Sequence, residues 1–255
     1  MHELFPHMYD SPESPQVVGS LSYGIVAFVV LPFTFTLFFF DRNAEGIYPV
    51  LEYIYYGLNF TMMLAIFNSY LRDSWLNVSI APKKVLLVSL TAAAVIVMLY
   101  LEFLRLSALG LFESAGVVFF GALPMAGIEL MLLPGDFALF GGIPAMVFLV
   151  VLGPVITSCL FYATAFAPVC VAGKRGLAYA SVAALLAVPR FITYFTVWGG
   201  WKEIALYLAQ LPIHLLACWT YQKTDTIWAP IFTHAMVNLF SCTVLYIMQL
   251  AGIIA

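Results

Sequence analysis

Three polar residues share one face of the last strongly apolar segment of the chain. His234 and Asn238 are four residues apart and Ser241 follows three later, so a helix presents all three along one side. A helix that presents an imidazole, an amide and a hydroxyl in line is directed at something polar. Hydrogen bonds between packed helices give the same pattern, and each such contact stabilises the bundle by about 0.6 kcal/mol and sometimes by up to ~2 kcal/mol. The spacing leaves both interpretations open.

Other apolar segments of the second half also carry polar groups, which cost free energy inside a bilayer unless they face water, a cavity or a partner. Glu129 is a carboxylate deep in an apolar window, where it must be protonated, paired or in contact with water. Arg190 lies near the end of its segment, so snorkelling to the interface also explains it. Packing alone also accounts for the hydroxyls that follow Pro154. The candidate lining residues of a polar cavity are Thr157, Ser158, Tyr162, Arg190, His214 and Ser241.

We predict that the segments that position these residues are membrane-spanning helices. Of the 255 residues, 64% are hydrophobic and only 9% are charged, and the mean hydropathy is +1.01. A soluble domain of this length carries about a quarter charged residues. We therefore predict an all-α fold, a polytopic membrane bundle of about eight transmembrane helices with about 20 residues each. The predicted spans are 20–40, 48–68, 84–104, 115–133, 142–167, 176–196, 203–221 and 227–250.

The chain divides into a predicted N-terminal tail, residues 1–19, and a single membrane domain, residues 20–255. The tail is acidic and lacks a basic n-region, so Leu21 to Phe40 predicts a retained helix and not a signal peptide. Between the second and third spans, Ser69 to Ile80 mixes aromatic and charged residues, which fits a short interfacial helix or an ordinary loop.

Composition and motifs argue against several function classes. The net charge is −3 and no Lys/Arg cluster indicates a nucleic-acid partner. Two of the four histidines, His2 and His7, belong to the tail, so a three-histidine metal site inside the bundle is not expected. The four cysteines have no CxxC spacing and fit buried free thiols. No cofactor is predicted, and membrane lipid is the expected partner.

Positive charge does not decide the orientation of the predicted bundle. Alternating spans place Arg72, Lys83, Lys84 and Lys202 on one side. The other side then collects Arg42, Arg105, Lys174, Arg175 and Lys223. Because orientation follows a clear excess of Lys and Arg, four against five predicts neither direction.

The segment around His234 resembles the C-terminal signature of the CAAX protease and bacteriocin-processing (Abi) family of intramembrane proteases. In that family a span ends in a short polar turn containing Thr, followed by a Leu/Ile-Trp-Ala-Pro-Ile run and an HxxxN motif. Here Thr224, Ile227 to Ile231, His234 and Asn238 follow this order without gaps. The resemblance covers about residues 142–250 and implies a conical polar cavity, in the plasma (inner) membrane of a prokaryote.

Two other motifs of the family depart from its pattern. Its EExxxR motif falls on Thr157-Ser158 with Tyr162 in place of arginine, and its FxxxH motif places Arg190 where histidine is expected. In the resembling enzymes a glutamate activates water, while histidine and asparagine hold the oxyanion. Water attack on an amide needs a general base, which neither Thr157 nor Ser158 supplies. His234 and Asn238 are thus half of a catalytic site.

These departures predict a family member that binds without cutting, with a peptide, a lipid or a partner helix as ligand. A first alternative is an active intramembrane peptidase, in which His234 and Asn238 hold the oxyanion and Glu129 or His214 acts as base. A second alternative is a structural subunit of a larger membrane complex, which the many aromatic residues would suit. If a site exists, Thr157, Arg190 and His234 should face one cavity.

Overall fold

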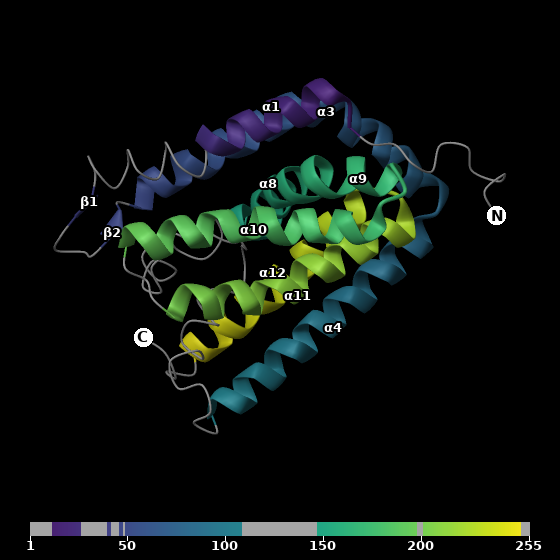
Figure 1. The fold of residues 1–255 in the computed structure, drawn as a ribbon. Coiled ribbons are helices and arrows are strands. Elements are labelled where there is room, and N and C mark those ends of the chain that lie inside the picture. The colour runs from purple at the N-terminus through teal and green to yellow at the C-terminus, as the bar shows by residue number, and fades with distance from the viewer. Residues whose placement is uncertain are drawn as a thin grey trace.

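The computed structural model describes residues 12–26, 40–41, 46–47, 49–108, 147–197 and 201–250 of the chain. Apart from a two-residue antiparallel ladder between β1 (Phe40–Asp41) and β2 (Gly46–Ile47), these residues are almost entirely helical. Helices run back and forth between the two ends of the molecule (Figure 1). The predicted all-α class is confirmed, and the fourth predicted span, 115–133, lies outside the described residues.

Helices of the first half begin earlier or run longer than their apolar windows. The elements are α1 (Ser14–Ile25), α3 (Pro49–Ile80) and α4 (Pro82–Ala108). Proline opens α3 and α4, at a position where its missing N–H costs nothing. Residues Ser69 to Ile80 continue α3, which decides between the helix and the loop in favour of the helix. Helix α1 begins inside the predicted tail, where the amide of Glu13 donates to Oε1 of Gln16 at 2.9 Å.

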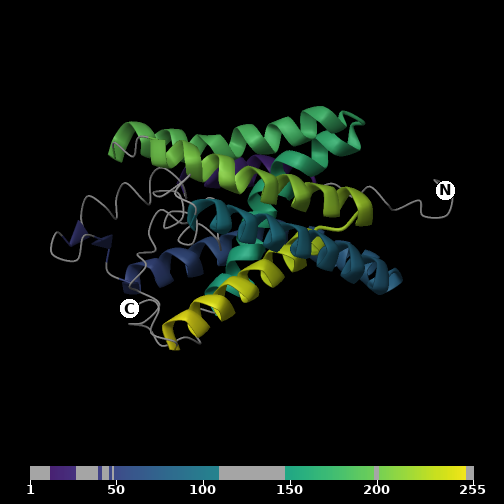
Figure 2. The same ribbon diagram turned by 90° about the horizontal axis from the view of Figure 1, so that it is seen from below.

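From residue 147 on, the described part of the chain forms four long helical segments. The first is one continuous rod made of η2 (Phe148–Leu152), α8 (Gly153–Thr157), η3 (Ser158–Phe166) and α9 (Ala167–Val171). The others are α10 (Arg175–Val197), α11 (Trp201–Thr224) and α12 (Trp228–Leu250). Seen from below, α10 and α11 lie together along one side of the bundle and α12 along the other (Figure 2).

The rod that carries η3 is wound as a π-helix over nine residues, Ser158–Phe166. Pro154 and Pro168 lie in the α-helical segments on either side of it. A proline inside a helix lacks a donor and displaces the carbonyl of the preceding turn, and such sites favour wider turns. The Thr164 hydroxyl donates to the Cys159 carbonyl, five residues back, at 2.8 Å. Because π-helical turns are frequent at functional sites, this segment points to the candidate site.

The core packs around this rod. Phe67 of α3, Phe161 and Phe166 of η3, Leu186 of α10 and Ile227 before α12 are fully buried in one cluster. Two described helices are long and apolar enough to cross a membrane by length and composition, at Pro82–Leu99 and Val150–Val171.

Three turns meet at one end of the bundle, which contradicts the predicted division of charge. Asn77 of α3 donates to the Asp225 carbonyl in the α11–α12 turn at 2.9 Å. The Tyr179 hydroxyl, near the start of α10, donates to Oε1 of Gln222 at 3.0 Å. The turns that bear Lys174, Arg175 and Lys223 therefore lie with the α3–α4 turn, and Lys202 lies at the opposite end. Strict alternation through all eight predicted spans was the wrong assumption.

Candidate functional site

Two histidines from neighbouring helices converge on one phenol in the core. The Tyr162 hydroxyl lies 2.7 Å from Nδ1 of His214 and 3.1 Å from Nε2 of His234. The imidazole rings are 5.6 Å apart between centroids and stand edge to face at 80°. Tyr162 and His214 are fully buried, and His234 is 6% exposed. Three predicted site residues from three separate segments are thus in contact.

The protons of this cluster are constrained by the phenol. A phenol has one proton to donate, so it donates to one ring nitrogen and accepts a hydrogen bond from the N–H of the other ring. The arrangement has two forms, which differ in the direction of both hydrogen bonds and in the tautomer of each imidazole. In either form, one ring nitrogen of each imidazole is held on the Tyr162 oxygen.

Local sequence explains how the three rings reach one another. Tyr162 lies in the middle of the π-helical segment η3, while Pro212 lies inside α11 two residues before His214. His234 follows Pro230 by one turn, in the first two turns of α12. Phe161 packs against the His214 ring at 5.0 Å between centroids and closes the apolar side of the cluster. Aromatic packing and hydrogen bonding together fix the ring orientations.

The remaining predicted site residues are distributed as follows. Asn238 is 2% exposed, one turn after His234 on α12, as its spacing predicts. Thr157 and Ser158 are buried at the junction of α8 and η3, and α8 packs against α3 and α12. The buried Ser158 hydroxyl makes no hydrogen bond to another described group. Glu129 lies outside the described residues, as do the side chains of Arg190 and Ser241. The expected meeting of Arg190 with His234 therefore stays a prediction.

The helices that hold the three rings carry a single carboxylate. Glu203 stands near the start of α11, eleven positions before His214 and therefore about 16 Å away along the helix axis. None of the residues in the rod from Phe148 to Val171 or in α12 is acidic. A general base supplied by these helices would have to be one of the imidazoles. Among the described residues, no group of three His, Cys, Asp or Glu side chains is placed to hold a metal ion.

Sequence reasoning missed one buried amide and one polar clamp. Asn59 of α3 is 2% exposed, and its position within an apolar span was the available signal. The Ser74 hydroxyl pairs with that of Thr226 at 2.8 Å and accepts from the Ile227 amide at 3.0 Å. These two contacts hold α3 against the turn that precedes the His234 helix. Nothing in the spacing of Ser74 and Thr226 predicts their meeting.

Comparison with protein-family models, with curated proteins and with solved structures gives no match to this chain.

Proposed function

We propose that this chain is a multi-pass membrane protein whose Tyr162–His214–His234 cluster binds the polar group of a ligand without cleaving it. The observation that carries the proposal is the convergence of two imidazole nitrogens on one oxygen. A position contacted by both rings suits any small oxygen, such as a carbonyl or hydroxyl of a peptide, lipid or partner helix. The phenol occupies that position, and a ligand oxygen displaces it.

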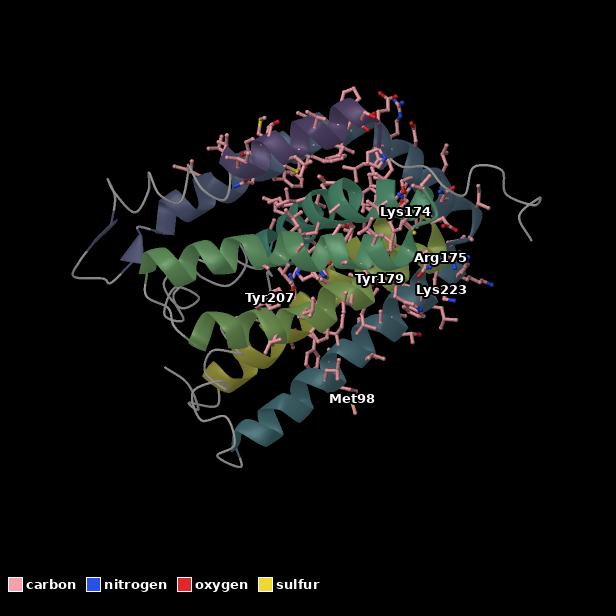
Figure 3. All side chains as sticks on the ribbon, viewed as in Figure 1. Met98, Lys174, Arg175, Tyr179, Tyr207 and Lys223 are labelled. Atoms are coloured by element: carbon pink, nitrogen blue, oxygen red, sulfur yellow. The ribbon has the colours of Figure 1, made fainter. Side chains whose placement is uncertain are left out.

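Its membrane location is supported by composition and by the surface of α4. Leu87 and Met98 are each 66% exposed, and Leu86, Leu90, Val95 and Leu99 are also exposed. Figure 3 shows Met98 projecting away from the other helices. Because soluble monomers rarely expose a continuous apolar patch of this kind, lipid is the solvent that suits it. The low share of charged residues, 9% of the chain, supports a membrane location for the whole bundle.

Binding without hydrolysis is favoured by how His234 is held. In the CAAX protease-like arrangement, the histidine and asparagine of the last motif would donate to an oxyanion. Here Nε2 of His234 faces the Tyr162 hydroxyl, which replaces the arginine of the resembling motif. A substrate carbonyl has to displace the phenol before it meets the imidazole, and Glu203 is too far along α11 to activate water.

Native mass spectrometry of the protein released from nanodiscs tests this proposal. Wild type should carry a bound peptide or lipid mass, and His234→Ala should lose it. Thr243→Ala is the matched control, because the Thr243 hydroxyl is exposed and, among the described residues, bonds to the Leu239 carbonyl of its own helix. Equal occupancy in all three proteins would overturn the proposal. A stoichiometric protein partner retained by every variant would favour the structural-subunit alternative instead.

One observation favours the peptidase alternative. The ring centroids of His214 and His234 lie 5.6 Å apart. His214 would then act as the base while His234 and Asn238 stabilise the oxyanion. An inventory of new peptide termini in membranes separates the two functions. Termini present with wild type but missing with His214→Ala and His234→Ala would support cleavage. Identical termini in all three strains support binding alone.

A further inference from the structure

The exposed basic side chains of the described helices gather at one end of the bundle. The α3–α4 turn, the α9–α10 turn and the α11–α12 turn meet there, tied by the bonds from Asn77 to Asp225 and from Tyr179 to Gln222. Figure 3 labels Lys174, Arg175 and Lys223 together at this end. The basic end carries six exposed cations, which are Arg72, Lys83, Lys84, Lys174, Arg175 and Lys223.

Among the described residues, cations outnumber carboxylates at the basic end and not at the other. Three carboxylates, Glu13, Asp73 and Asp225, accompany the six cations, and the exposed Asp73 pairs with Arg72 at 3.3 Å. Arg105, Arg190 and Lys202 fall in the opposite halves of their helices. The acidic positions Glu52, Glu102 and Glu203 fall in the same halves. Among the described residues, the basic end therefore carries a net positive charge and the other end does not.

Helix electrostatics does not explain most of the basic end. Lys83 and Lys84 stand in the first turn of α4, and Arg175 opens α10. A helix N-terminus carries partial positive charge and favours acidic residues, so these three cations are unfavourably placed with respect to their own helices. Only Lys223, in the last turn of α11, is stabilised by its helix. The other cations call for an anionic partner outside the protein.

Aromatic side chains mark a membrane boundary just inside Lys83, Lys84, Lys174, Arg175 and Lys223, while Arg72 stands three residues before Trp75 in α3. Trp75 is 45% exposed and packs edge to face on Trp228 at 4.9 Å between ring centroids. The Trp228 indole donates to the Leu71 carbonyl at 2.9 Å, which fixes the pair. Trp75 stands five residues before the end of α3, about 8 Å along its axis. Tryptophan concentrates at the headgroup level of membranes, with Lys and Arg beyond it on the cytoplasmic side.

We infer that the basic end is the cytoplasmic face of the protein, seated against the anionic phospholipid headgroups of its own membrane. This inference rests on the proposed membrane location but not on the proposed ligand site. Five Lys and Arg residues in or next to short turns, with Arg72 further back in α3, outnumber the three described at the other end and give the bias that the positive-inside rule requires. The described α12 ends opposite the basic end, so residue 250 lies on the outer side.

Cysteine labelling in intact cells tests the orientation. Glu102→Cys and Glu203→Cys should react with a membrane-impermeant maleimide from outside, whereas Lys84→Cys and Lys223→Cys should react only after permeabilisation. Two positions at each end keep the test decisive if one variant fails to fold. Labelling of Lys84→Cys and Lys223→Cys in intact cells would overturn the inference. Release of the protein by alkaline carbonate would instead refute the membrane location itself.

The lipid contact has its own test in purified protein. Vesicles of phosphatidylcholine mixed with phosphatidylglycerol should raise the melting temperature of wild type above its value in phosphatidylcholine alone. Replacing Lys83, Lys84, Lys174 and Arg175 with Gln should remove that difference. The control Arg105→Gln/Lys202→Gln should keep it. A wild-type melting temperature that is the same in both vesicle types would overturn the headgroup contact.

Discussion

His214 and His234 stand edge to face in neighbouring helices, with ring centroids 5.6 Å apart, and each turns one nitrogen to the same phenol oxygen. Such a pair has to be bridged, because two buried imidazoles facing each other across a gap would leave polar atoms unsatisfied. Tyr162 supplies the bridge from a π-helical turn, and the pair thereby links the rod, α11 and α12.

Coupling within the cluster is the first prediction. Tyr162→Phe should lower the free energy of unfolding by about 1–3 kcal/mol, because two buried ring nitrogens lose their common partner. In a double-mutant cycle with His214→Phe, the coupling energy should exceed about 0.5 kcal/mol. Unfolding in mixed detergent micelles measures both quantities. Strict additivity of the two substitutions would show that the phenol and the imidazole do not interact.

The clamp between Ser74 and Thr226 gives a second prediction. Ser74→Ala should cost about 1–2 kcal/mol, because the buried Ile227 amide loses its acceptor, while the Thr226 hydroxyl keeps its bond to the Ser74 carbonyl. Ser79→Ala is the matched control, since its exposed hydroxyl bonds only to the Trp75 carbonyl within α3. The control should change stability by less than about 0.5 kcal/mol. Equal effects of the two substitutions would argue against the clamp.

A third prediction concerns the two tryptophans at the basic end. Trp228→Phe should destabilise the protein more than Trp75→Phe, because only the Trp228 indole donates to a backbone carbonyl, that of Leu71. The difference should be about 1 kcal/mol, the net contribution of one hydrogen bond. Thermal unfolding of the two variants side by side measures it. A larger loss of stability in Trp75→Phe would mean that packing of the exposed Trp75 ring contributes more than the hydrogen bond of the Trp228 indole.

Thiol accessibility supplies a fourth prediction. Cys159 and Cys218 are free and fully buried in the core, so neither should react with maleimide in the folded protein. Both should react once the chain is unfolded in a strong detergent, as peptide mass spectrometry can record. Rapid modification of either thiol under native conditions would contradict the packing around the rod.

Much of the helical framework was predictable from hydropathy, and the site residues were predictable only one helix at a time. The windows 84–104, 176–196 and 203–221 fall inside α4, α10 and α11, and 227–250 begins one residue before α12, because long apolar runs leave the backbone few alternatives to a helix. Ser69 to Ile80 extended α3 beyond its window, since exposed Arg72 and Asp73 lower its hydropathy without breaking the helix.

Periodicity placed His234 and Asn238 on one buried face, and it placed Tyr162 and His214 in spans of their own. It does not determine which helices become neighbours, so neither the bridge from Tyr162 to His214 nor the pairing of Ser74 with Thr226 followed from it. The prediction of which basic residues share an end of the bundle was wrong for the same reason: periodicity does not determine which helices become neighbours. Contacts between turns, such as Asn77 with Asp225, decide which charges share an end.

The most direct test of ligand binding at this cluster is whether removing the Tyr162 hydroxyl changes the amount of bound ligand. Native mass spectrometry of Tyr162→Phe compares the bound mass with that of wild type in the same nanodiscs. If the phenol holds the position of the ligand oxygen, its removal should raise the bound fraction, whereas His234→Ala abolishes it. Unchanged or lower occupancy in Tyr162→Phe, with the protein folded, would show that the phenol is a permanent structural bridge and that no ligand replaces it.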